Sequence, residues 1–191
     1  MKAAAFVRYR SGDGFGHVGW AFEVGDGRVN AGSVENHSGH LFTPAPQMGF
    51  WNGCFADPVD QMRARRYDDL KWIDVPHPDP MRAYATVLWI EHQAYRALFR
   101  NCEDDAYDVL RAYGVEGLPP PMFAWLPKTW FSRFHGVLER LPDYRWRPTS
   151  GDSQPLENAV PWRPTWRRPW HPDFHALKLT RVAHLGRAWR L

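Results

Sequence analysis

The chain has 191 residues, and its 44% hydrophobic content is enough for the core of one folded domain, which excludes a disordered chain. Its two cysteines, Cys54 and Cys102, are too few for a disulfide framework or an all-cysteine zinc site. No stretch approaches the roughly 18 consecutive apolar residues that a membrane span needs. The apolar run at residues 1–8 is too short for the hydrophobic segment of a secretory signal peptide. We therefore expect a cytoplasmic protein without a membrane span.

The net charge of +3 is unevenly distributed along the chain. Residues 141–191 hold nine Lys or Arg against four Asp or Glu, a net of +5, which leaves −2 for residues 1–140. The same segment carries five tryptophans separated by prolines, an order that excludes a regular helix or a central strand. We therefore expect a domain over 1–140 and a basic, Trp/Pro-rich extension over 141–191 that packs on the domain or docks a partner.

The N-terminal part of the chain predicts a small antiparallel sheet. Apolar runs over 3–9, 17–24 and 28–34 have the composition of strands. Asp26-Gly27, between the second and third runs, is the standard signal for a two-residue hairpin. His17 then lies at the beginning of the second strand.

The middle of the chain predicts a long loop followed by helices. Residues 36–56 show no sustained helical or strand periodicity and are predicted to form a long loop, with a short strand near Phe50-Trp51. Asp57-Pro58 predicts a helix to about residue 69, and 70–75 has the pattern of a strand. Asp79-Pro80 repeats the helix signal, and apolar residues at three- and four-residue spacing predict a long amphipathic helix to about residue 99.

The next helix places Cys102 at its first position. Asn101 is a preferred N-cap, an apolar stripe follows, and Gly114 is a C-terminal stop signal, so we expect a helix over 102–113. Leu126-Pro127 opens one further helix to about residue 140.

Cys102 and His17 are the candidate catalytic pair. A cysteine is a nucleophile as the thiolate, and both a helix N-terminus and an imidazolium lower a thiol pKa. Gly16 and Gly19 on either side of His17 are expected to leave room for a substrate. The acidic residues that follow Cys102 oppose thiolate formation.

A third polar group is expected to orient the imidazole. Glu35 and Asn36 are the first choices, with Ser33 behind them. The register of the hairpin decides among them, because a slip of one residue turns every side chain to the other face.

These segments resemble the circularly permuted branch of the NlpC/P60 superfamily, which includes the lecithin retinol acyltransferase-like proteins. The resemblance rests on Gly16-His17-Val18-Gly19, the Gly25-Asp26-Gly27 hairpin and Asn101-Cys102 at a helix start, and covers roughly 3–36 and 100–114. It implies an α+β fold of permuted papain-like type, with Cys102 as nucleophile and His17 as general base. It also implies a cysteine-dependent hydrolase or acyltransferase acting on a peptide, isopeptide or lipid-ester substrate, with no cofactor.

Other interpretations stay open beside this one. Buried free cysteines are common in cores, so the same scaffold is also compatible with a non-catalytic interaction or structural module. The tryptophans and arginines of 141–191 suit a protein partner, and nucleic acid is the less favoured ligand. Metal ligation by Glu35, His37 and His40, or by His171, Asp173 and His175, matches no ligand signature, and we expect no metal site.

Overall fold

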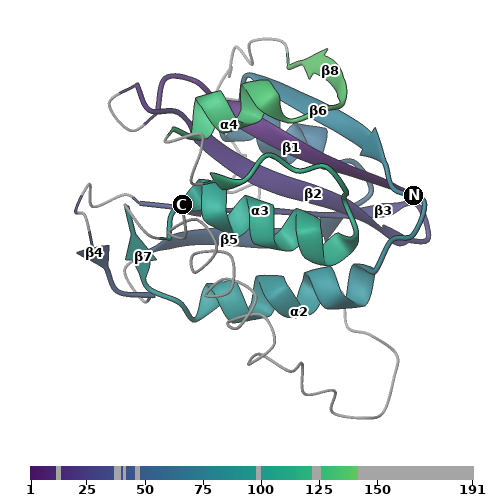
Figure 1. Cartoon of the computed structure of the whole chain (residues 1–191), viewed down its shortest axis with the longest axis horizontal. Coiled ribbons are helices and arrows are strands. Elements are labelled where there is room, and N and C mark those ends of the chain that lie inside the picture. Colours follow the sequence, from purple (N-terminus) through teal and green to yellow (C-terminus); the bar gives the residue numbers. More distant parts are fainter. Residues whose placement is uncertain are drawn as a thin grey trace, which may run out of the picture.

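The protein is described by a computed structural model covering residues 1–11, 14–36, 40, 42–45, 48–97, 100–121 and 126–141. The predicted extension over 141–191 lies outside the described residues except for its first residue, Leu141. The described part is an α+β fold with a six-stranded antiparallel sheet in the order β5-β3-β2-β1-β6-β8 (Figure 1). The strands of this sheet are β1 (Lys2–Arg8), β2 (His17–Gly25), β3 (Arg28–Glu35), β5 (Gly49–Phe55), β6 (Asp69–Asp74) and β8 (Val137–Arg140).

Four helices and a short ribbon complete the described fold. The helices are α1 (Val59–Ala64), α2 (Pro80–Glu91), α3 (Cys102–Tyr113) and α4 (Pro127–Arg133), and the ribbon pairs β4 (Phe42–Thr43) with β7 (Tyr95–Arg96). Helices α2, α3 and α4 lie on one side of the sheet, which we call the helix face (Figure 1). Helix α1 packs through Met62 on the other side, which we call the α1 face.

The two faces have separate hydrophobic cores because successive side chains of a strand point to opposite faces. Val18, Trp20 and Phe22 of β2 pack on the helix face with residues of α2, α3 and α4. Ala21 of β2 packs on the α1 face, together with Phe6 of β1. Strand β2 is therefore buried on both sides, which explains its nearly continuous apolar sequence.

The predicted turn and cap chemistry is confirmed where it is local. Asp26 and Gly27 both have positive φ, 54° and 68°, as the two-residue hairpin between β2 and β3 requires. The Asn101 side chain accepts hydrogen bonds from the backbone N–H groups of Glu103 and Asp104, and Gly114 ends α3 with φ 105°. Cys102 is the first residue of α3, as predicted.

Two predicted helices are wrong in extent. Helix α2 ends at Glu91 rather than near residue 99, because Tyr95 and Arg96 pair with β4 and two backbone bonds close the turn between Arg96 and Arg100. Helix α4 ends at Arg133 rather than near residue 140, and Val137–Arg140 forms β8 at the sheet edge beside β6. In both places pairing with a distant strand overrides a local helical pattern.

Smaller differences concern the middle of the chain. The first predicted helix stops at Ala64, and Asp69 already belongs to β6. The stretch read as a loop with a short strand holds a full seven-residue strand, β5, paired with β3 along its whole length. In the described part of the chain, no helix is long and apolar enough to cross a membrane.

Lys71 of β6 fastens α4 to the sheet. Its ammonium donates hydrogen bonds to the backbone carbonyls of Phe131 (2.9 Å), Ser132 (3.1 Å) and Phe134 (2.9 Å) at the C-terminal end of α4. The Phe131 carbonyl also accepts the backbone N–H of Phe134 at 3.2 Å. The last carbonyls of a helix lack a following turn that would satisfy them fully, and a cation beside them also complements the helix dipole.

We predict that Lys71→Met lowers the free energy of unfolding by about 1.5–3 kcal/mol, the usual value for hydrogen bonds to a charged group. Urea unfolding followed by circular dichroism measures the change. Lys2→Met, at an exposed position of β1, is the matched control and should change stability little. Equal effects of the two substitutions would contradict this role of Lys71.

Candidate functional site

His17 lies at the start of β2 on the α1 face of the sheet. It pairs in register with Arg8 of β1, as Gly19 pairs with Phe6 and Ala21 with Ala4, and cross-strand partners share a face. Phe6, Ala4 and Ala21 all belong to the core of the α1 face. The imidazole accordingly lies 5.8 Å, centroid to centroid, from the ring of Tyr67 in that core.

The imidazole is held in a polar cluster on this face, which we call the His17 cluster: Arg8, His17, Ser33, Glu35 and Tyr67. Nε2 of His17 lies 2.5 Å from Oγ of Ser33 and 3.8 Å from Oε1 of Glu35. The Tyr67 hydroxyl donates to Oε1 of Glu35 at 3.4 Å, and the Arg8 guanidinium lies 3.6 Å from Oε2 of Glu35.

Sequence reasoning found part of this cluster. Glu35 and Ser33, two of the three predicted partners, do contact His17. For Asn36, the other, the structure shows a side chain that donates to the His40 carbonyl and accepts from the Thr43 hydroxyl. Arg8 lies in the predicted strand 3–9, but no sequence signal placed it or Tyr67, 50 residues beyond His17, beside the imidazole.

The His17 cluster is closed. Ser33 is fully buried and His17 is 6% exposed. A Cβ on Gly19 would lie 2.3 Å from the Phe6 ring, and one on Gly16 would lie 2.9 Å from Cβ of Lys128. The room that these two glycines were expected to leave for a substrate is thus filled by Phe6 and Lys128.

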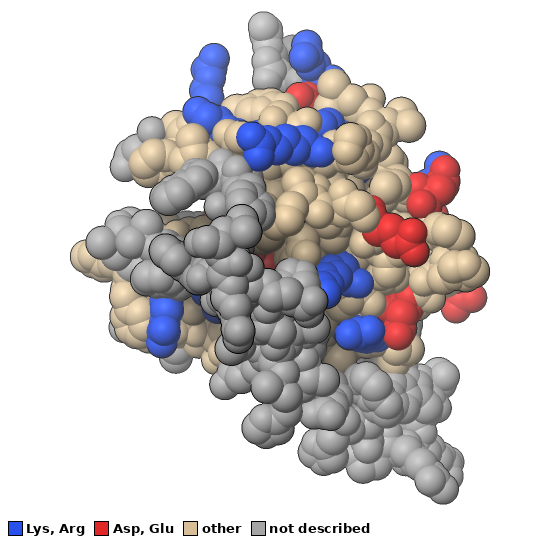
Figure 2. Space-filling model, in the orientation of Figure 1, with Lys and Arg blue, Asp and Glu red and all other residues tan. Residues whose placement is uncertain are grey.

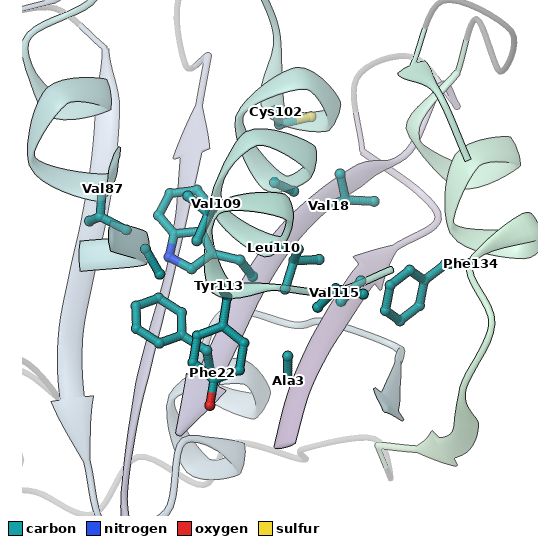
Figure 3. Close-up of a cluster of buried hydrophobic side chains, with 14 of the residues drawn as sticks. Ala3, Val18, Phe22, Val87, Cys102, Val109, Leu110, Tyr113, Val115 and Phe134 are labelled. Carbon is teal, nitrogen blue, oxygen red and sulfur yellow. The ribbon is translucent and has the colours of Figure 1, made fainter. Parts of the chain in front are cut away.

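Cys102 lies on the helix face. Its side chain packs in the core with Val18, Ala106 and Val109, and Figure 3 shows its sulfur at the start of α3 beside Val18. Burial raises the pKa of the thiol to about 12, a backbone hydrogen bond with Val18 opposes the rise, and the carboxylates of the first turn of α3 add to it. At neutral pH the sulfur is therefore a thiol, which is a poor nucleophile.

The sheet separates the two candidate catalytic side chains. Val18, next to His17 in β2, contacts Cys102, but the imidazole of His17 points to the opposite face. The fold therefore brings the backbones of the two segments near one another without bringing the imidazole to the sulfur.

The first turn of α3 contains two buried carboxyl groups. Glu103 is 3% exposed, and burial raises its pKa to about 8, with a contribution from Asp104. Asp105 is 2% exposed and lies 2.6 Å from the Arg100 guanidinium, which stacks on Trp89 at 4.0 Å. These groups make the surroundings of Cys102 acidic.

The sequence also offered histidine and carboxylate sets as metal ligands. Among the residues that the structure describes, no group of three or more His, Cys, Asp or Glu side chains could hold a metal ion. Of the ligands considered from the sequence, His37 and the set His171, Asp173 and His175 lie outside the described residues.

Acidic and basic side chains both occur on the face of the molecule in Figure 2.

Glu103 makes a pH-dependence prediction. Its folded pKa of about 8 exceeds the value of about 4.3 expected in the unfolded chain, so its contribution to stability is complete below about pH 4 and is lost as the pH rises through 8. We predict that Glu103→Gln, which cannot ionise, gains stability relative to the wild type between pH 5 and pH 8, by on the order of a few kcal/mol.

The measurement is the free energy of unfolding by urea at pH 5, 6.5 and 8 for both proteins. Glu116→Gln, at an exposed position after α3, is the control and should keep a constant difference from the wild type. A constant difference for Glu103→Gln as well would show that Glu103 is not a buried acid.

Comparison of the chain with family models, with curated proteins and with solved structures gives no match. The resemblance to the permuted NlpC/P60 superfamily accordingly rests on the sequence segments given above.

Proposed function

We propose that the chain is a non-catalytic interaction module, built on a scaffold of permuted NlpC/P60 type, that docks a protein partner through the Trp- and Arg-rich extension over 141–191. The observation that carries the non-catalytic part is the placement of His17 and Cys102 on opposite faces of the sheet. A thiol hydrolase needs its imidazole within hydrogen-bond reach of the sulfur.

The state of each side chain supports the same proposal. The thiol of Cys102 has a raised pKa and is 3% exposed, so it is neither ionised at neutral pH nor open to a substrate. The imidazole of His17 is engaged by Ser33 and Glu35. Both groups act as parts of the folded core, as buried polar and thiol groups commonly do.

The composition of the extension supports a protein partner. It contains Trp146, Trp162, Trp166, Trp170 and Trp189 together with nine Lys or Arg. Tryptophan and arginine are enriched where protein interfaces derive most of their affinity, because they bury large areas at low entropic cost and still hydrogen-bond. Nucleic acid would also use stacking and positive charge, but its binding would depend strongly on salt.

The first test measures the reactivity of Cys102. We predict that its rate of alkylation rises about tenfold per pH unit from pH 7 to 9 without a plateau, because the thiol pKa is about 12. His17→Ala should leave the profile unchanged, since its ring lies across the sheet. Iodoacetamide labelling of the full chain, followed by peptide mapping, separates Cys102 from Cys54.

A plateau below about pH 7 that disappears in His17→Ala would contradict the proposal and favour the thiol hydrolase or acyltransferase. In that case the substrate classes to assay are peptide, isopeptide and lipid-ester bonds.

The second test addresses the partner. We predict that full-length protein carrying Trp162→Ala, Trp166→Ala and Trp170→Ala loses proteins that the wild type retains from nuclease-treated lysate of the source organism. The matched variant Arg163→Gln, Arg167→Gln and Arg168→Gln should retain them at 0.3 M salt. Quantitative mass spectrometry compares the three samples. The wild type is also tested with untreated lysate: proteins retained from untreated lysate but lost after nuclease treatment would instead point to a nucleic acid.

A further inference from the structure

Three strands present a row of polar side chains to the core of the helix face. Trp20 of β2 is opposite Gly32 of β3, which is opposite Asn52 of β5. Asn30, two residues from Gly32 along β3, is opposite Cys54. Because cross-strand partners share a face and Trp20 packs in the helix-face core, the side chains of Trp20, Asn30, Asn52 and Cys54 all lie on that face.

Within the part of the chain that the structure describes, three atoms of this row are buried without a hydrogen-bond partner: Nε1 of Trp20, Oδ1 of Asn30 and Oδ1 of Asn52. Trp20 and Asn30 are fully buried. The amide nitrogen of Asn30 already donates to Sγ of Cys54 at 3.7 Å, which leaves its oxygen as the free acceptor. Buried polar groups in folded proteins nearly always have a partner, so three orphans on one stretch of sheet need an explanation.

Gly32 lets the Trp20 indole lie over β3, the strand that carries Asn30 and pairs with the strand of Asn52. A Cβ on Gly32 would lie 2.7 Å from Cζ2 and 3.0 Å from Cε2 of Trp20, so the indole lies over this glycine. Nε1 is bonded to Cε2, and it therefore lies above β3, two residues from Asn30 along the strand and across from Asn52. Diagonal neighbours of this kind have Cβ atoms about 7–8 Å apart, a span that one bridging molecule can cover.

The hydrogen-bonding pattern specifies the ligand. The site offers one donor, the indole N–H, and two acceptors, the amide oxygens. A water molecule accepts one hydrogen bond and donates two, which satisfies all three atoms at once, and buried waters typically make about three such bonds. We propose that β2, β3 and β5 share a buried structural water bound by Trp20, Asn30 and Asn52.

A direct test uses the unaltered full-length protein. In solution, the indole proton of Trp20, assigned by its loss in Trp20→Phe, should show a nuclear Overhauser effect of negative sign to a long-lived water. A crystal structure at about 1.8 Å or better should show one spherical density peak within 3.2 Å of the three atoms. Direct bonds among the three side chains, with no water signal, would overturn the proposal, and so would density for a larger molecule.

A mutant cycle gives an independent readout. If one water links the two amides, the effects of Asn30→Ala and Asn52→Ala on unfolding should be non-additive, although no direct hydrogen bond joins the residues. Asn30→Ala combined with Asn36→Ala, which lies at the loop after β3, is the control and should be additive. Additivity in both pairs would contradict a shared ligand, and the measurements on the wild type stand even where a variant fails to fold.

Discussion

Successive side chains of a β-strand point to opposite faces of its sheet, and at the start of β2 this rule assigns His17 to one core and Val18 to the other. The rest of the molecule follows this division. Tyr67 and Glu35 close over the imidazole on the α1 face, while the start of α3 rests on Val18 on the helix face. Turning His17 toward Cys102 would shift the whole strand by one residue and drive Trp20 and Phe22 out of their core.

The sizes of two opposing effects, the helix dipole and desolvation, explain why Cys102 at the start of α3 stays a thiol. The N-terminus of a helix stabilises an adjacent anion by about 0.3–1 kcal/mol, which corresponds to less than one pKa unit. Burial, reinforced by Glu103, Asp104 and Asp105, raises the pKa of Cys102 from 9.0 to about 12. Desolvation therefore outweighs the helix dipole, and the geometry is that of a packed core residue.

Buried polar groups find their hydrogen-bond partners in different ways on the two faces of the sheet. On the α1 face, the members of the His17 cluster satisfy one another through contacts between β1, β2, β3 and Tyr67. On the helix face, the orphaned atoms of Trp20, Asn30 and Asn52 have the pattern that a shared water completes. The contacts of the His17 cluster link neighbouring strands, and the proposed water would do the same on the helix face. Such contacts favour one register over alternatives, since a slip would leave buried groups unpaired.

The sequence by itself determined the features that depend on a few adjacent residues: the Asp26-Gly27 hairpin, the Asn101 cap, the Gly114 stop and the position of Cys102 at the start of α3. It also predicted that Glu35, Asn36 or Ser33 would meet His17, and the structure shows Ser33 and Glu35 in contact with the imidazole. Only the tertiary structure decided where α2 and α4 end, that β8 joins the sheet, and that Tyr67 reaches the imidazole. Turn and cap chemistry is local, whereas the face that a doubly buried strand presents depends on what packs against it. An apolar run such as that of β2 carries no period from which to read that face.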